Sequence, residues 1–341
     1  MKNRLTSYLL FITVFLFPCA IFAETQSSIT ISGEVKQPLS IAIDKLAGFQ
    51  TVNVQLNEVM RDKTYKGAFN YRGVALKTLL DMASIEKKAK SSSKGIDLAI
   101  KITNKEGKSV VLSWGEIYYR NSGDIIIATE ATPIKPHKSC ANCHKDEKYY
   151  KPYLDVLDRK VEFPKLVVGG DGYAERSIEG VTSIEVINPA HEEVKKGANS
   201  GAGKLFSPSF SINGSVKKEM ILTDLSKYPR KELRMIHMGE GKGFHGIGDY
   251  SGPTLKTLVE EAGVNNDLTT VFIVTAPDGY RSLFSYGELF LNRGDDSIII
   301  ADKINGKAIE EEGKFFLVPC DDIMSDRDVK SVEKIEVLSL K

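Results

Sequence analysis

Five short segments of this 341-residue chain occur twice in the same order, and this internal repeat constrains the fold more than any other feature. Each copy opens with Gly-x-Val-Lys, continues with Tyr-x-Gly-x-x-Leu-Lys-Thr-Leu and closes with Ile-Glu-Val. The copies are much further apart than the units of a solenoid, so the repeat predicts two domains of one fold. The matched segments are residues 33–36 and 214–217, 71–79 and 250–258, 113–117 and 285–289, 125–128 and 298–301, and 181–186 and 332–337.

Each copy has the same predicted order of elements. A short alternating strand opens the first copy at residues 29–35, and apolar residues at helical spacing follow at 76–82. The second copy has its helix at 255–262, with Gly252 and Pro253 just before it. Runs rich in β-branched residues make up most of the remainder. We therefore predict an α+β fold made of two tandem, mostly-β domains.

The first 23 residues are typical of an export signal. Lys2 and Arg4 precede an almost wholly apolar stretch, and Ala23 provides a small residue before a cleavage point. A periplasmic or otherwise exported protein is predicted, in a compartment where paired cysteines tend to oxidise. A retained membrane anchor and a lipoprotein attached through Cys19 are the alternatives.

The signal and the repeat together give the predicted organisation of the chain. Residues 24–187 form the first domain, residues 208–341 the second, and residues 188–207 a flexible linker rich in Gly, Ser, Asn and Lys. The matched segments are 173 residues apart at 128 and 301 but only 151 apart at 181 and 332. The first domain therefore contains an insertion, which we place at residues 132–160.

The composition limits the classes of partner. A formal net charge of +1 gives no electrostatic basis for binding nucleic acid. No segment after the signal is apolar for long enough to span a bilayer, so no membrane contact is expected after cleavage. The sequence favours no particular oligomeric state.

The insertion carries the residues with the clearest chemistry. Cys140, Cys143 and His144 form the Cys-x-x-Cys-His attachment motif of c-type haem. Each thiol can form a thioether to a haem vinyl group, and His144 then presents a ring nitrogen to the iron. One covalently bound haem c is therefore predicted, with His144 as the proximal ligand.

The sixth iron ligand is a separate question. His137 is the first candidate, and an open or water-filled position is the alternative. Two of the more distant candidates lie in a Gly-rich stretch that the sequence predicts as a flexible loop rather than a small-ligand site. The distant candidates are Met60, His237, Met238 and His245.

Two other interpretations of the motif stay open. His137, Cys140, Cys143 and His144 could together bind zinc, although structural zinc sites usually take their ligands from two separated pairs. Cys140 and Cys143 could instead form a disulfide or redox pair. Such a pair is expected at the start of a helix that follows a strand, and no strand pattern precedes it here.

Both copies resemble the sulfite-oxidase-like, molybdopterin-binding oxidoreductase domain. The resemblance rests on the Gly-x-Val opening, the Tyr-x-Gly-x-x-Leu helix entry, the Ile-Ile-Ile-Ala strand, the Asp-Gly-Tyr turn at 278–280 and the closing Ile-Glu-Val. It covers most of both copies and implies the fold of that family. Because structural residues carry it, the resemblance supports the fold better than an activity.

The chain departs from this family at the metal ligand. The resemblance implies a molybdenum-binding cysteine within residues 52–61 or 233–241, and neither segment contains a cysteine. Cys320 lies where the family pattern places no ligand. A molybdenum centre needs a soft thiolate, so its absence argues against molybdopterin as a cofactor.

These observations predict an exported, mono-haem, c-type cytochrome-like protein that transfers single electrons between redox partner proteins. An electron carrier is favoured over an enzyme, and no catalytic residue is assigned. If the chain is an enzyme, an oxidoreductase is expected. The alternatives are a haem-based binding or sensor module and a molybdopterin-type oxidoreductase.

Overall fold

The computed structural model describes residues 27–87, 94–135, 148, 151–189, 205–239, 241, 243–294, 296–310 and 313–341. The described part of the chain is mostly β, with 45% of its residues in strands and 17% helical. The α+β class predicted from the sequence is therefore wrong, and so is the arrangement as two α+β sulfite-oxidase-like domains, although the mostly-β part of the prediction agrees. The physical reason is that the apolar helical patterns are short and the long apolar runs between them pair as strands.

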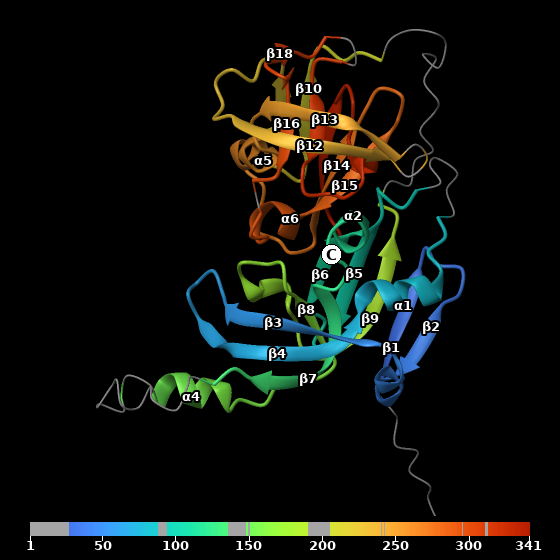
Figure 1. The fold of residues 1–341 in the computed structure, drawn as a ribbon, viewed down its shortest axis with the longest axis vertical. Helices are drawn as coiled ribbons and strands as arrows, with labels where there is room; N and C mark the ends of the chain where they lie inside the picture. Colours follow the sequence, from blue (N-terminus) through green and yellow to red (C-terminus); the bar gives the residue numbers. More distant parts are fainter. Residues whose placement is uncertain are drawn as a thin grey trace, which may run out of the picture.

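Two halves of the chain contain five-stranded sheets with the same topology. We call residues 27–189 the N-terminal half and residues 205–341 the C-terminal half; the first lies below the second in Figure 1. The first sheet has the order β2 (Leu39–Ala42), β1 (Ser28–Gly33), β9 (Val181–Ile187), β5 (Ala99–Asn104) and β6 (Ser109–Ser113). The second has the order β11 (Met220–Leu222), β10 (Phe210–Gly214), β20 (Lys334–Ser339), β14 (Thr270–Thr275) and β15 (Arg281–Ser285). In each sheet only the second and third strands pair in parallel.

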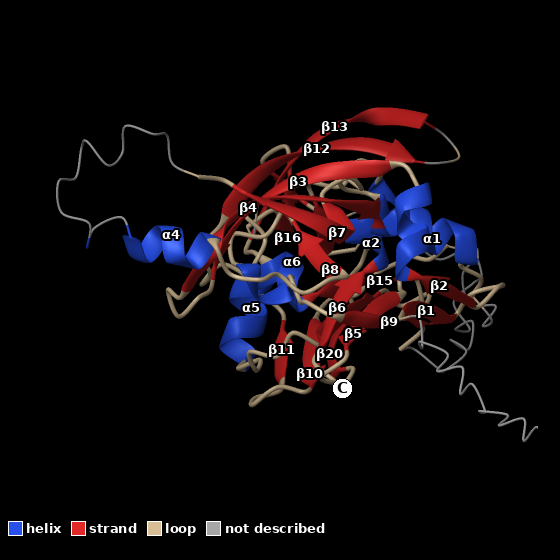
Figure 2. Cartoon of the chain, turned by 90° about the horizontal axis from the view of Figure 1, so that it is seen from below, coloured by secondary structure: helices blue, strands red, loops and turns tan. Residues whose placement is uncertain are grey.

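A second layer of strands in each half is built on a long hairpin. In the N-terminal half the order is β3 (Thr51–Val59), β4 (Tyr65–Ala75), β7 (Ile125–Pro133) and β8 (Lys165–Val168). In the C-terminal half, β12 (Lys231–Gly239) and β13 (Gly243–Gly252) form the hairpin, followed by β17 (Lys303–Ile304) and β18 (Lys307–Ala308). Strands β16 (Ile298–Ala301) and β19 (Phe316–Pro319) pair beside them. Figure 2 shows the two hairpins on the same side of the molecule.

The helices are short, and three of those described, α2, α5 and α6, begin at a capping Ser or Thr side chain. Helices α1 (Leu76–Ala83) and α5 (Leu255–Ala262) occupy equivalent places, and each buries one apolar face. Helices α2 (Trp114–Tyr118) and α6 (Tyr286–Phe290) both begin with a Ser–Glu capping box. The remaining helical segments are η1 (Ile43–Gly48), α4 (Lys151–Leu157), η3 (Ala174–Arg176) and η4 (Ser325–Arg327). None of the helices in the described ranges is long and apolar enough to cross a membrane.

Each half has its own apolar core, and a smaller apolar cluster joins the halves. The outward faces of β5 and β6 contribute Ala99 and Val111, and β14 and β15 contribute Val271, Ile273 and Leu283. All five side chains are buried. Burial of this surface favours a fixed arrangement of the two halves.

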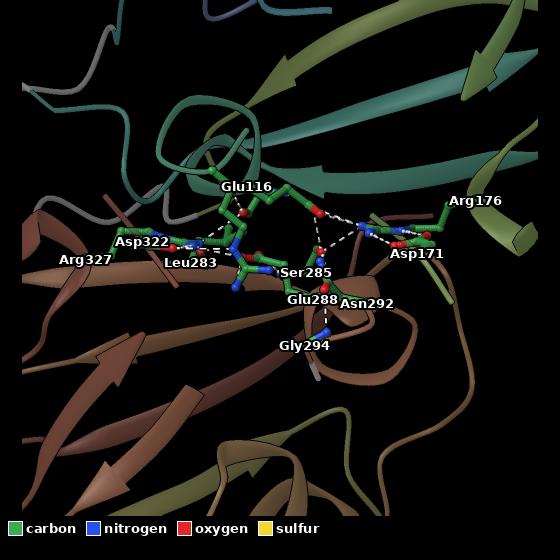
Figure 3. Close-up of polar contacts among 12 residues, drawn as sticks. Glu116, Asp171, Arg176, Leu283, Ser285, Glu288, Asn292, Gly294, Asp322 and Arg327 are labelled. Carbon is green, nitrogen blue, oxygen red and sulfur yellow. Dashed lines mark hydrogen bonds and ion pairs between the residues drawn. The ribbon is translucent and has the colours of Figure 1, made fainter. Parts of the chain in front are cut away.

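Two buried arginines connect the halves, and they are arranged with approximate two-fold symmetry (Figure 3). Arg176, in η3, forms a two-pronged ion pair with Asp171, with nitrogen–oxygen distances of 2.7 and 2.9 Å. It also donates to Glu116 of its own half, at 2.8 Å, and to Ser285 of the other half, at 3.1 Å. Each contact lies in a fully buried region, so the arginine charge depends on these carboxylates.

Arg327, in η4, makes the equivalent contacts from the C-terminal half. It is paired with Asp322, donates to Glu288 at 2.9 Å and reaches Ser113 of the N-terminal half at 3.2 Å. The close approach requires glycine, because a Cβ atom at Gly115 would lie 2.2 Å from the Arg327 side chain. Each half therefore places an arginine against the capping box of the other.

The symmetry is broken by one further arginine. Arg120 lies 3.6 Å from Glu288 and 3.5 Å from Asp322, whereas the equivalent position in the C-terminal half is Asn292. Burial alone would raise the pKa of Glu288, but the charges of Arg327 and Arg120 lower it to about 2. Glu288 is therefore ionised throughout the neutral range.

We expect Arg327→Met to lower the free energy of unfolding by about 3–5 kcal/mol, because it removes the hydrogen-bonded counter-ion of the buried Glu288 and Asp322 and leaves them only the more distant Arg120. The control is Arg234→Gln, which removes an exposed ion pair with Asp249 and is expected to cost less than about 1 kcal/mol. Urea denaturation of both variants measures the difference. Equal losses for the two variants would contradict the role given to Arg327.

Candidate functional site

A cavity of about 700 Å³ lies in the C-terminal half. One wall is the β12–β13 hairpin, and the other is formed by the turn after β14 and by η4 with the residues that follow it. Its lining is a mixture of polar, charged and apolar side chains, which is typical of small-molecule sites. The polar lining includes His237, His245, Tyr250, Asp278, Ser325, Asp326, Asp328 and Lys330.

A β-bulge in the hairpin turns His237 toward this cavity. Up to His237 and Gly246 the strands β12 and β13 pair in regular register, and the register shifts by one residue after this pair. Gly246 has a φ of +129°, which residues with a side chain rarely adopt. The β3–β4 hairpin has a register shift at the equivalent place, with Gly67 at a φ of +112°. Such bulges re-aim side chains.

His237 lies between a phenol and a carboxylate. The Tyr250 hydroxyl is 2.9 Å from His237 Nε2, and Asp328 Oδ2 is 3.6 Å from His237 Nδ1. Burial raises the pKa of Asp328 to about 6, with His237 opposing this shift. The second oxygen of Asp328, Oδ1, is buried without a hydrogen-bond partner. The carboxylate thus lines the cavity beside the imidazole, with one oxygen toward His237.

The N-terminal half fills the equivalent space with its own side chains. The position of His237 is taken by Glu58, which contacts the hydroxyl of Tyr71. Arg159, just after α4, donates to both oxygens of Glu58 at 3.0 Å and to Glu179 at 2.8 Å. Lys165 is 2.9 Å from Glu58 and completes a buried cluster of opposite charges.

The predicted haem-binding residues lie outside the described residues. These are Cys140, Cys143 and His144 of the motif and His137, the candidate sixth ligand; the 1–23 export signal also lies outside the described ranges. Their placement, and the haem itself, therefore stay predictions.

The described flanks of the insertion are held together. Tyr153, in α4, donates a hydrogen bond to the backbone oxygen of Ile134, at 3.1 Å, and its ring stacks on Tyr65 with 5.5 Å between centroids. Ile134 in turn donates its N–H to Ala68 in β4, at 2.8 Å. Tyr153 thus has a structural role in fixing α4 against the sheet.

The structure corrects one expectation and adds residues that the sequence analysis missed. His237 and His245 lie on the strands of the β12–β13 hairpin and line the cavity, so the stretch is not the flexible loop that its glycines predict. Asp328 and Lys330 were not singled out by any motif. Comparison of the repeats at the 151-residue offset could have found Lys330, because it replaces the buried-cluster residue Glu179.

Among the described residues, no group of three or more His, Cys, Asp and Glu side chains is arranged to hold a metal ion. Cys320 is half-buried against the apolar cluster around Val318. Burial and the nearby carboxylates raise the pKa of its thiol to about 12. Cys320 is therefore a protonated packing residue and not a thiolate ligand.

No family model matches the chain, and no curated protein matches it. Among solved structures, the crystal structure of the sulfane dehydrogenase SoxCD from Paracoccus pantotrophus aligns with a TM-score of 0.34 and 12% sequence identity. The alignment covers 92% of this chain and 78% of that chain. A likeness at this level carries no argument about this chain, so the family resemblance stays a prediction from the sequence motifs.

The buried carboxyl of Asp328 gives a prediction for stability against pH. Its pKa of about 6 lies above its ordinary value of 3.8, so the folded chain binds more protons than the unfolded chain between these values. Stability should therefore fall as the pH rises from about 4 to about 6. We expect Asp328→Asn to remove this decline, which amounts to at most about 3 kcal/mol.

Urea denaturation from pH 4 to pH 7 measures this effect. The control is Asp224→Asn, at an exposed carboxylate whose pKa is lowered by its hydrogen bonds to Ser226. This control should not remove the decline. If Asp328→Asn and the unmodified chain lose stability in parallel over this range, the buried carboxyl does not cause the decline.

Proposed function

We propose that this chain is an exported c-type haem protein that transfers single electrons between redox partners. The observation that carries the proposal is the Cys-x-x-Cys-His motif at residues 140–144. Two thiols and a histidine at this spacing match the donor set of a covalently attached haem. The export signal predicted at residues 1–23 supports it, because it places the cysteines outside the cytoplasm.

The position of the motif in the chain supports the proposal further. The strand before it, β7, and the helix after it, α4, both pack on β4, and Tyr153 joins their ends through Ile134. In the second half, the described residues between β16 and β19 form the short β17–β18 hairpin. The motif therefore lies on a segment that one half has gained, with both of its ends fixed to a sheet.

Cys140 and Cys143 would hold the haem through thioethers, and His144 would bind the iron. Haem iron supplies reversible one-electron chemistry when it is bound. The protein's part is to attach the group, to fix its orientation through the anchored flanks and to limit its exposure to water. A haem-based sensor is the second candidate function, because an open sixth position would admit a small gaseous ligand.

The residues do not fit a molybdenum cofactor. Residues 52–61 and 233–241 contain no cysteine, and Cys320 is a half-buried thiol with a raised pKa. We therefore derive no molybdenum chemistry for this chain.

Expression with a c-type haem maturation system is expected to give a protein that keeps its haem after denaturation. Cys140→Ala together with Cys143→Ala should abolish covalent attachment, because both thioether positions are removed. Cys320→Ser is the matched control and should keep the haem. Absorption of the pyridine haemochrome and the mass of the intact protein measure attachment. An unmodified chain without covalent haem from such a host would rule out the proposed function.

A second measurement separates the carrier from the sensor. A six-coordinate haem that is oxidised and reduced reversibly, without binding carbon monoxide, is expected for the carrier. A five-coordinate reduced haem that binds carbon monoxide would favour the sensor. Absorption spectra of the oxidised, reduced and carbon monoxide-treated protein distinguish the two.

A further inference from the structure

We infer that the cavity of the C-terminal half is a binding site for a small organic acid with an apolar body. The inference goes beyond the proposed electron transfer and does not depend on it. In Figure 1 the β12–β13 hairpin, which forms one wall of the cavity, lies in the upper part of the molecule, and α4, which follows the haem motif in the sequence, lies at the lower left. The other copy of the repeat shows which kind of group the equivalent space accepts.

In the N-terminal half, the equivalent space receives a cation from the chain itself. The guanidinium of Arg159 is bound between Glu58 and Glu179 and lies over the ring of Phe69, 5.2 Å from its centroid. Two carboxylates and an aromatic face are a typical site for a guanidinium. The N-terminal half therefore shows the pocket when it is filled by a cation, the guanidinium of Arg159.

In the C-terminal half, the two carboxylate positions carry residues that can be positively charged. The pairing of the two hairpins shows that Glu58 and His237 occupy equivalent positions. Leu56 pairs with Phe69 in one hairpin and Met235 pairs with Gly248 in the other, and Glu58 and His237 each follow two residues later. Glu179 and Lys330 also occupy equivalent positions. The N–H of Leu166 in β8 donates to Ile178, next to Glu179, and the N–H of Leu317 in β19 donates to Val329, next to Lys330. The two positions that bind a cation in the N-terminal half therefore favour an anion in the C-terminal half.

The carboxylates near these two positions have partners of their own. Asp328 Oδ2 lies 3.6 Å from His237 Nδ1. Asp326 forms an ion pair with Lys94 of the N-terminal half, and Asp278 accepts the backbone N–H of Tyr280 within a turn, at 2.9 Å.

The rest of the cavity is suited to an apolar body. Gly248 stands where the other half has Phe69, and the side chains of Tyr250 and Ile304 lie next to it. Phe316 replaces Lys165, and Ile247 and Ile304 line the same cavity. Among its described residues, the second half has no helix between β16 and β19 that corresponds to α4, the helix just before Arg159. The geometry therefore favours a carboxylate at His237 and Lys330 with an apolar or aromatic group against Phe316.

Phenylacetate and benzylamine test the inference, because they have the same ring and opposite charges. We expect the full chain at neutral pH to bind phenylacetate, and to bind benzylamine at least about tenfold more weakly. Isothermal titration calorimetry and shifts of the protein's NMR signals measure both affinities. Benzylamine binding as tightly as phenylacetate, or no phenylacetate binding at millimolar concentration, overturns the inference.

Two substitutions restore the residues of the other half. Lys330→Glu and His237→Glu should each weaken phenylacetate about tenfold or more, and the double substitution should reverse the preference toward benzylamine. Lys307→Glu, at an exposed position on β18 outside the cavity lining, is the control and should leave both affinities unchanged. Lys330 is exposed, so its substitution tests the site even if His237→Glu does not fold. Unchanged phenylacetate binding in Lys330→Glu overturns the inference.

Discussion

The buried arginine–carboxylate network between the halves is the interaction on which the rest of the structure depends. Arg176 and Arg327 each connect a 3₁₀ turn of one half to a capping-box serine of the other. The turn that holds Arg327 also begins the segment that carries Asp328 and Lys330 into the cavity. Because buried charges of this kind tolerate little displacement, the network fixes one wall of the cavity relative to the β12–β13 hairpin. The Ser325 side chain adds a direct contact by accepting the N–H of Met238, at 3.0 Å.

The same hairpin backbone surrounds a filled pocket in the N-terminal half and an open cavity in the C-terminal half. The hairpins β3–β4 and β12–β13 share their register, their bulge and a glycine of positive φ at the same place. What differs is the set of side chains that faces inward. In one half, Glu58 and its partners neutralise one another, and the pocket is closed. In the other, His237 is held by Tyr250 and Asp328, and the space before it stays open. The backbone fixes where a ligand can lie, and a few substitutions decide its charge.

The sequence predicts the strands and helices of both copies better than it predicts their class or their site. The short helices at α1 and α5 were visible from apolar spacing, but most of the remaining apolar runs pair as strands, which makes the chain mostly β rather than α+β. The arginine network was missed because each Asp-x-x-x-x-Arg, at 171–176 and 322–327, resembles an ordinary loop until the repeats are aligned. The cavity was missed because Lys330 and His237 are 93 positions apart in the sequence, and only the sheet register brings them together.

The insertion in the N-terminal half contains both the predicted haem motif and the arginine that fills the pocket of that half. Residues 132–160 carry the predicted haem motif, and the same segment ends with Arg159, the side chain that fills the pocket of that half. This one segment therefore carries both the predicted haem motif and the side chain that fills the pocket of its own half. The sequence of the C-terminal half contains no Cys-x-x-Cys-His motif. Arg159 also fixes the end of the insertion, since its guanidinium joins Glu58 of β3 to Glu179 beside β9. The two halves thus differ by one guanidinium: Arg159 fills the pocket of the N-terminal half, and we propose that the pocket of the C-terminal half takes an outside ligand instead.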